Sequence, residues 1–583
     1  MSALLCRLGV ALSPIYLKEA LNTVTISRNN FSSTEPSVDA IALLHSADAI
    51  TSFDRFLAAF RRKKLNQSEA LRVCLSLIKR EPGDLLKLIE ALPAAWADHA
   101  VASAYATLIP ADRRKSLGAY FTPPHLVDHL VSRLASCGVD LVGHRLRDPA
   151  AGGAAFLVPL ARIKVSAWKK LGLTDDEITH RLRVHLIGRE IEPDLAAIAN
   201  ALLRRMLVCE FGFVPKSVAH LRLVKVGDSL DVRISSDDDI DHEVGNPPFL
   251  RLGACDRRLS RPIFGEITSG RVNLYALFVR RALEEVPIGG MVGYVIPASF
   301  LGGPEFESFR RRVLQLAEVL VVDLVEKRSD VFLDAIQDAC FIVLRRRVEA
   351  LIEPPAGMAA SGVFRRDGNF ISKGAAHIET DGAPWQLPGV ELARSSTLKD
   401  WGYRATVGYL VANRQPTRMH KRAAKGRYPL IWAKAITPEG TFDFERGAAF
   451  KGYGWADAPA DAPYVVRTAC VAVQRTSSRG QKRRLNAASI SKDFIENNGG
   501  IIGENHVILL VPDTPDAASP ESLAEALNKA AVSAALDRVC GSASISVRLL
   551  ETIKLEARPT ICACRPHDDS EKRVQPRKTM VPL

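Results

Sequence analysis

The sequence predicts an α/β protein with a helical N-terminal segment and a C-terminal α+β domain. Three observations lead to this prediction. Between Gly118 and Arg347, short apolar runs alternate with amphipathic helical patterns, as in an α/β sheet. Upstream, apolar residues such as Phe53, Phe56 and Phe60 recur at helical spacing. Downstream, short strand-like runs are separated by basic loops.

The residue pattern and composition change at four points along the chain, which indicates five parts. We expect a helical segment, an α/β domain, a linker rich in Pro, Gly and Ala, an α+β domain and a disordered polar tail. Their predicted ranges are 1–114, 115–350, 351–395, 396–560 and 561–583.

Composition narrows the class of protein. Of 583 residues, 47% are hydrophobic and 25% charged, as in soluble globular proteins of two or three domains. The net charge of +13 favours a polyanionic partner, the alternative being a basic but merely solvated surface. Ten cysteines lack metal-binding or disulfide spacing, so we expect no metal and reduced thiols in a cytoplasmic protein. No apolar run is long enough for a membrane span.

Four of the predicted strands end in an acid or an amide. In an open α/β sheet the ligand lies outside the carboxyl ends of the strands. We therefore expect Asp148, Glu190, Asp228 and Asn246 to line one crevice in sequence order. The seven predicted strands are Leu141–Asp148, Val184–Glu190, Leu221–Asp228, Asp241–Asn246, Gly290–Pro297, Val319–Val325 and Ala339–Leu344.

The segment Asn246-Pro247-Pro248-Phe249 has the groups needed to hold a planar base by its exocyclic amine. The amide oxygen of Asn246 and the carbonyl of Pro247 can each accept one N–H of an amino group. Proline fixes φ, so the Pro247 carbonyl is aimed in advance. Phe249 offers a face on which a ring can stack. The alternative is an ordinary loop end.

The loop from Asp148 to Leu157 follows the first of these strands and opens a helix. Its small residues, among them Ala150 and Gly152, let the backbone pass close to a ligand. Phosphate-binding glycine patterns are missing from it, and the leading acid favours a cationic ligand. Glu190 can accept both hydroxyls of a ribose, and Asp228 can accept an adenine amine. Each acid alone could equally be a strand-end cap.

Thr122 lies in an upstream turn, Tyr-Phe-Thr-Pro-Pro, at residues 120–124. It can cap the helix that begins at the prolines. Alternatively, this turn closes over one end of the ligand.

In their order along the chain, these segments resemble the gamma-class N6-adenine DNA methyltransferases of the TaqI-like, type II restriction-modification methylase family. The resemblance covers about residues 115–350 closely. It implies a Rossmann-like, S-adenosyl-L-methionine-dependent methyltransferase domain followed by a target-recognition domain. It also implies methylation of N6 of a flipped-out adenine in double-stranded DNA. We expect a cytoplasmic monomer with no membrane partner, and a cognate restriction endonuclease, where one exists, as a separate chain.

The resemblance also assigns site residues. Phe332 matches the aromatic that flanks the flipped base, and a core ring is the alternative. The implied base contacts are Asn246, Pro247, Pro248, Phe249 and Phe332. The implied cofactor contacts are Tyr120, Thr122, Asp148, Ala150, Gly152, Glu190, Ile191, Asp228 and Asn246.

The chain departs from the family pattern in the cofactor loop. Ala151 stands where the family has Cys, and Ala154 where it has a second Gly. Because alanine favours φ < 0, we expect a slight shift of this loop. Asn273 replaces an Asp in the segment Asn273-Leu274-Tyr275, a mild change.

Two basic clusters in the predicted C-terminal domain are suited to binding DNA. Most of their side chains would contact phosphates, and a few Arg or Gln would contact base edges. Solvated loops are the alternative. The expected DNA contacts are Arg414, Arg418, Lys421, Arg422, Gln474, Arg475, Arg479, Lys482, Arg483 and Arg484.

Three other functions compete with this one. A protein glutamine methyltransferase uses a similar Asn-Pro-Pro turn, but the large basic C-terminal region argues against it. A catalytically silent DNA-binding protein is disfavoured by the intact Asn246–Phe249 turn. A single-chain restriction enzyme is disfavoured because the N-terminal segment shows no convincing nuclease pattern.

Overall fold

The computed structural model describes most of the chain between Ala47 and Arg558. Tyr120, Phe332, Arg479 and Lys482 lie outside the described residues, as does the predicted tail. The described ranges are 47–61, 65–81, 84–110, 122–231, 239–253, 256–267, 272–325, 339–365, 368–380, 382–388, 395–476, 483–539 and 545–558.

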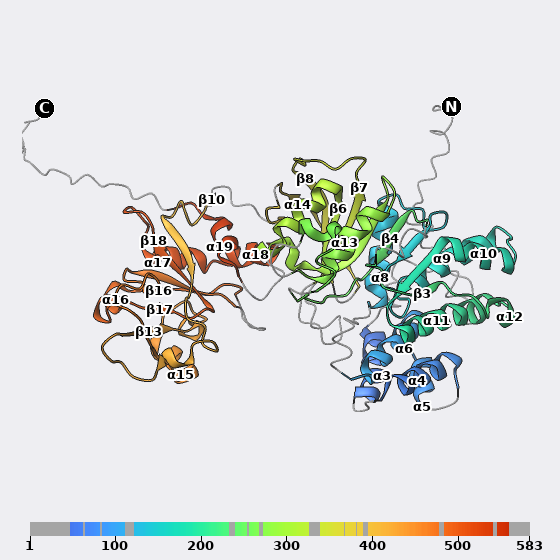
Figure 1. Cartoon of the computed structure of the whole chain (residues 1–583), viewed down its shortest axis with the longest axis horizontal. Coiled ribbons are helices and arrows are strands. Elements are labelled where there is room, and N and C mark those ends of the chain that lie inside the picture. Colours follow the sequence, from blue (N-terminus) through green and yellow to red (C-terminus); the bar gives the residue numbers. More distant parts are fainter. Residues whose placement is uncertain are drawn as a thin grey trace, which may run out of the picture.

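Four helices form the described part of the N-terminal segment, and Figure 1 shows them beside α11 (Pro193–Phe211). Phe53, Phe56 and Phe60 are buried, as their helical spacing predicts. A capping box between Asn66 and Glu69 starts the second of these helices. The four are α3 (Ala47–Arg61), α4 (Gln67–Lys79), α5 (Asp84–Glu90) and α6 (Ala94–Leu108).

A nine-stranded mixed sheet follows, in the order β3-β2-β1-β4-β5-β7-β6-β8-β9. The five neighbouring strands β3, β2, β1, β4 and β5 run parallel to one another. Strand β7 pairs antiparallel with both β5 and β6. All seven predicted strands are present, most of them shorter at their start. The nine are β1 (Leu146–Asp148), β2 (Leu186–Glu190), β3 (Val224–Val226), β4 (His242–Gly245), β5 (Met291–Pro297), β6 (Ala317–Val325), β7 (Ala339–Arg346), β8 (Gly357–Phe364) and β9 (Phe370–Ile378).

Helices cover both faces of the sheet, so the domain has three layers. Alternate side chains of β5 enter different cores: Met291 and Val295 one, Tyr294 and Ile296 the other. The helices of the first face include α8 (Pro124–Ser136), α9 (Leu157–Lys170), α10 (Asp175–His185) and α11, and those of the second α13 (Leu274–Glu285) and α14 (Glu307–Leu316).

The expected sequence order of the four site residues is wrong. The chain moves outward from β1 to β2 and β3, then returns to the other side of β1 with β4. Across the sheet the order is therefore Asp228, Glu190, Asp148, Asn246. The reversal makes a topological switch point between β1 and β4, where open α/β sheets bind ligands. Asp148 and Asn246 flank that point.

The expected linker at 351–395 needs a second correction. Residues 357–378 form β8 and β9, and β8 pairs parallel with β6 from Val321 to Val325. The antiparallel pairing of β8 with β9 needs a small residue at Gly362. An added Cβ at Gly362, for example, would lie 2.5 Å from the carbonyl oxygen of Ile371. At Gly362, close strand contact and not chain flexibility explains the small residue.

The C-terminal residues form a separate α+β lobe, coloured orange to red in Figure 1. In its described residues, a two-stranded sheet pairs β10 (Ser395–Ser396) with β19 (Leu555–Glu556). Two four-stranded sheets have the orders β11-β18-β15-β16 and β12-β14-β13-β17. Their strands are β11 (Tyr403–Val407), β12 (Met419–His420), β13 (Arg427–Ile431), β14 (Trp455–Asp457), β15 (Cys470–Gln474), β16 (Ala487–Ile490), β17 (Ile502–Gly503) and β18 (Val507–Pro512).

Five helices accompany these two sheets. An ion pair between Arg548 and Glu307 of α14 joins the lobe to the central domain. Across the described residues, no helix combines the length and apolarity needed to cross a membrane. The five helices are α15 (Phe444–Lys451), α16 (Lys492–Asn497), α17 (Pro520–Leu527), α18 (Ala530–Val539) and α19 (Val547–Thr552).

Candidate active site

The Asn246 turn leaves the end of β4 at the switch point. Its amide Nδ2 donates to Oγ1 of Thr122 over 2.9 Å. The N-cap residue of α8 is Pro123, so Thr122 is not the helix cap and instead contacts Asn246. Two motifs that are 124 positions apart in the sequence therefore meet at one hydrogen bond.

Gly245 allows the Asn246 turn to approach the cofactor loop. An added Cβ at this position would lie 2.8 Å from Oδ1 of Asp148 and 3.4 Å from Cδ of Pro149. Such a distance to Oδ1 is too short for a real Cβ. Glycine is therefore required for the two strand ends to pack this closely.

The ring of Phe249 is partly buried and meets Tyr275 edge to face, with centroids 6.3 Å apart. Tyr275 in turn stacks on Phe306 at 5.8 Å. This aromatic packing of Tyr275 against Phe249 restrains the position of the Phe249 ring. Phe332, the predicted partner on the other side of a base, is outside the described residues.

The loop after β1 turns tightly around Asp148. Oδ1 of Asp148 accepts from the amide of Ala150 over 3.1 Å, and the amide of Ala151 donates to the carbonyl of Arg189 over 2.8 Å. Gly152 has φ 49° and Ala154 has φ 61°. The expected shift of this loop away from positive φ is wrong: Ala154 adopts the left-handed conformation that the family's glycine suits.

Glu190, at the end of β2, closes the other side of this loop. Its Oε2 accepts from the amide of Gly152 over 2.8 Å, and its Oε1 accepts from the amide of Glu192 over 2.9 Å. Each carboxylate oxygen has a second lone pair for a ligand hydroxyl. The next residue, Ile191, is 56% exposed and presents an apolar surface beside the carboxylate.

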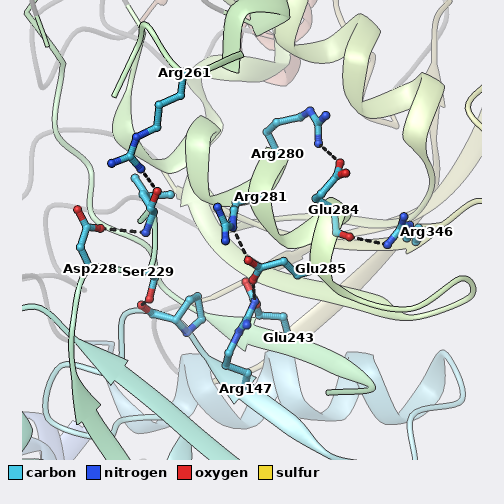
Figure 2. A network of polar contacts seen from close by, with 12 residues as sticks. Arg147, Asp228, Ser229, Glu243, Arg261, Arg280, Arg281, Glu284, Glu285 and Arg346 are labelled. Atoms are coloured by element: carbon cyan, nitrogen blue, oxygen red, sulfur yellow. Dashed lines mark hydrogen bonds and ion pairs between the residues drawn. The ribbon is translucent and has the colours of Figure 1, made fainter. Parts of the chain in front are cut away.

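Asp228 belongs to a loop that is held by hydrogen bonds to Pro149 and from Arg261, as Figure 2 shows. Asp228 Oδ1 accepts from the amide of Leu230 over 2.9 Å, and Ser229 Oγ donates to the carbonyl of Pro149 over 2.5 Å. Arg261 donates to the carbonyl of Leu230. The segment after the Asn246 turn is thus tied to the loop that carries Asp228.

Two carboxyl groups of the site carry raised pKa values. Burial, with the charges of Glu190 and Glu243 adding to it, raises the pKa of Asp148 well above its usual range. Burial likewise raises the pKa of Glu190. A cation beside these groups would stabilise their ionised forms. The site therefore fits a cationic ligand with hydroxyl groups, and S-adenosyl-L-methionine has both.

A buried ion network that the motifs do not reveal joins the strands of the site (Figure 2). Arg147 of β1 donates from Nε to Glu243 of β4 over 2.7 Å and also pairs with Glu285 of α13. Tyr294 of β5 donates to Glu243. Its one sequence signal is Arg147 itself, a charge in an otherwise buried strand next to Asp148. The network sets the spacing between Asp148 and Asn246.

The N-terminal helices contact α9, α11 and the residue before α11. Tyr105 of α6 donates to Oδ2 of Asp194 over 3.0 Å, and Gln67 donates to Oε1 of Glu192 over 3.3 Å. Arg162 of α9 pairs with Asp98 at 2.5 Å. These contacts pack the N-terminal segment against α9 and the start of α11, an arrangement that its sequence alone did not indicate.

The predicted DNA contacts divide into two groups. Arg414, Lys421 and Arg422 are exposed. Arg418 is held within the fold, donating to the hydroxyl of Tyr464 over 2.8 Å and to the carbonyl of Asp457 over 2.7 Å.

The second cluster is largely engaged by its own lobe. Arg475 donates to the carbonyl of Asn505 over 3.0 Å, and Gln474 is buried against Asn486. Arg483 donates to the carbonyls of Asn528 and Pro438. Arg484 is partly buried, and its amide donates to Oγ of Ser533 over 3.2 Å. These bonds use part of the donor capacity of Arg475 and Arg483, and a contact of either side chain with DNA stays a prediction.

The fold is that of a Rossmann-like methyltransferase. Residues 222–332 match the Eco57I restriction-modification methylase family. The type II methyltransferase M.PaeR7I of Pseudomonas aeruginosa is 27% identical over 231 residues, 37% of this chain and 38% of that protein. M.BsuBI of Bacillus subtilis is 30% identical over 93 residues, 16% of this chain and 18% of that protein. These matches confirm the resemblance to type II restriction-modification methylases. They span less than half of each relative's length.

Two solved structures of restriction-modification enzymes are similar to this chain. The type IIL restriction-modification enzyme MmeI, in complex with DNA, is 14% identical with a TM-score of 0.45, over 93% of this chain and 85% of that one. The DNA-bound type ISP enzyme LlaBIII is 12% identical with a TM-score of 0.46, over 92% and 46%.

Proposed function

We propose that this protein transfers a methyl group from S-adenosyl-L-methionine to N6 of an adenine in double-stranded DNA. The observation that carries the proposal is the hydrogen bond from Asn246 to Thr122, because it joins the base-binding turn to the turn that is expected to close over the cofactor. The relatives named as type II methyltransferases support the same class of reaction. The protein then acts as the modification component of a restriction-modification system.

The residues of the Asn246 turn hold the target amine. Because Nδ2 of Asn246 is directed to Thr122, its amide oxygen is the end of the side chain that accepts an N–H of the base. The Pro247 carbonyl accepts the second, and Phe249 stacks on the ring of a base flipped out of the duplex. With both hydrogens held, the nitrogen lone pair turns towards the methyl donor.

The cofactor residues bind and orient. Glu190 accepts ribose hydroxyls, Ile191 covers the adenine ring and Asp228 accepts its amine. When bound, S-adenosyl-L-methionine supplies a methyl group activated by its sulfonium. The chain's contribution to rate is alignment of the two reactants in a closed pocket. No group of His, Cys, Asp or Glu suited to a metal ion occurs among the described residues.

The test is methyl transfer from labelled cofactor to duplex DNA, to protein extract and to no acceptor, with the modified base identified by sequencing. We expect label in DNA as N6-methyladenine. Asn246→Ala should lose more than about 90% of turnover, equal to about 1.4 kcal/mol of barrier, while keeping cofactor affinity. Label on protein glutamine instead of DNA would overturn the proposal.

A further inference from the structure

A cleft of about 490 Å³ opens in the C-terminal lobe, away from the site described above. Loops from both sheets form it: one follows β13, one follows β15 and one precedes β18, with the end of α15 as a further wall. Its lining includes Asn413, Lys434, Phe450, Lys451, Asn505 and His506.

The accessible charge at this cleft is positive. The ring of Phe450 is 53% exposed, and the Nζ atoms of Lys451 and Lys434 lie 5.2 and 5.7 Å from its centroid. The acid of the lining, Glu504, is only 2% exposed, and its Oε1 lies 2.7 Å from Nδ1 of His506. A polyanion therefore meets two lysines at the mouth without facing an open carboxylate.

The cleft is also rigidly built. The amide of Asn505 donates to the carbonyl of Leu410 over 2.9 Å, and its carbonyl accepts from Arg475 over 3.0 Å. Both backbone polar groups of Asn505 are thus used, which sets its place in the wall. Arg475, expected from the sequence to touch DNA, is a positioning residue for this loop.

We propose that this cleft reads base edges of the DNA duplex. The inference rests on the proposed function and names the part of the lobe that selects the methylated sequence. The amides of Asn413 and Asn505 each offer a donor and an acceptor, the pair needed for an adenine edge in the major groove. Lys434 and Lys451 contact the flanking phosphates. The exposed face of Phe450 packs against sugar or a thymine methyl group.

The first test measures affinity for a pool of duplexes with a randomised centre, over a series of salt concentrations. Near 0.1 M salt, the double variant Lys434→Gln/Lys451→Gln should bind about tenfold more weakly for each phosphate that it no longer neutralises. The slope of log K against log salt should fall by about 0.9 for each such phosphate. The matched control is Lys399→Gln/Lys492→Gln, in which two exposed lysines outside the cleft are neutralised in the same way. It should change both quantities far less.

The second test is sequence selection. Asn413→Ala and Asn505→Ala should each relax the methylated sequence at one base pair, read by sequencing of modified DNA, with cofactor affinity unchanged. An unchanged salt slope in the lysine variant, or an equal effect in the control, overturns the cleft assignment. So does tighter binding of an RNA duplex of the same length.

The two proposals fail separately. DNA binding is measured without methyl transfer, so the salt series tests the cleft even in a protein that methylates nothing. If the wild type binds DNA through Lys434 and Lys451 but transfers no methyl group to it, the cleft stands and the proposed function falls. If it methylates DNA and the variants bind normally, the cleft assignment falls alone.

Discussion

Asn246 donates a hydrogen bond from Nδ2 to Oγ1 of Thr122 over 2.9 Å, from the end of β4 to the residue before the N-cap of α8. This bond sets which end of the amide faces a substrate. An amide that rotated by half a turn would present a donor to the target amine, which is itself a donor. We therefore expect Thr122 to act on turnover through Asn246.

Thr122→Val should lower kcat by about fivefold, the value of one hydrogen bond of about 1 kcal/mol, because Asn246 loses its acceptor. Thr122→Ser keeps the hydroxyl and should restore most of the rate. Single-turnover methylation measures the effect. Equal rates for the Val and Ser variants would show that the hydroxyl does not orient Asn246.

Ala154 holds φ 61° at a buried position of the cofactor loop. Glycine there relieves strain of about 1–2 kcal/mol, offset by about 0.4–1 kcal/mol of chain entropy and by the loss of a buried methyl. We therefore expect Ala154→Gly to change the free energy of unfolding by less than about 1 kcal/mol.

A β-branched residue at the same φ is far more strained. Ala154→Val should lower the free energy of unfolding by about 2 kcal/mol or more and weaken cofactor binding. Ala155→Val, at the neighbouring residue, is the matched control in urea unfolding. If both valine variants behave alike, left-handed strain at Ala154 is not the cause.

Cofactor binding should depend on pH through Asp148 and Glu190. Both pKa values are raised, by burial first. A cationic ligand prefers both groups ionised, so its affinity should rise as pH rises through the raised values, with release of protons. Calorimetric titration in buffers of different ionisation enthalpy counts those protons. Asp148→Asn should reduce the count; a flat pH profile in the wild type would contradict the cation fit.

The same shifts affect stability with the opposite slope. A carboxyl whose folded pKa lies above its unfolded value binds more protons in the folded state. Its contribution is complete below the unfolded pKa and is lost as pH rises through the folded pKa. In the absence of cofactor, the free energy of unfolding should therefore fall over that window, and less so in Asp148→Asn.

The two basic clusters of the lobe should respond differently to substitution. Arg483→Ala removes bonds to the carbonyls of Asn528 and Pro438, so it should lower Tm with little effect on the salt slope of DNA binding. Lys421→Gln/Arg422→Gln changes exposed side chains and should lower that slope by up to about 0.9 per contact. A slope that falls only in Arg483→Ala would reverse these roles.

The sequence by itself determined the seven strands from β1 to β7 and the residue types at the ends of four of them. Short apolar runs and strand-to-helix turns are local features, so Asp148, Glu190, Asp228 and Asn246 could be placed at strand ends from their neighbours alone. The order of motifs was enough to indicate the family.

Only the tertiary structure decided which strand ends are neighbours and how charged side chains are used. The return of β4 to the far side of β1 is a long-range pairing that local pattern does not encode, and it brings Asn246 to Thr122. Small residues at 357–378 permit either a flexible linker or closely packed strands, and the pairing with β6 selects the strands. The sequence does not reveal whether an arginine side chain binds a DNA phosphate or a carbonyl of its own chain. Arg475 and Arg483 donate hydrogen bonds to backbone carbonyls because folding brings Asn505 and Asn528 close to them.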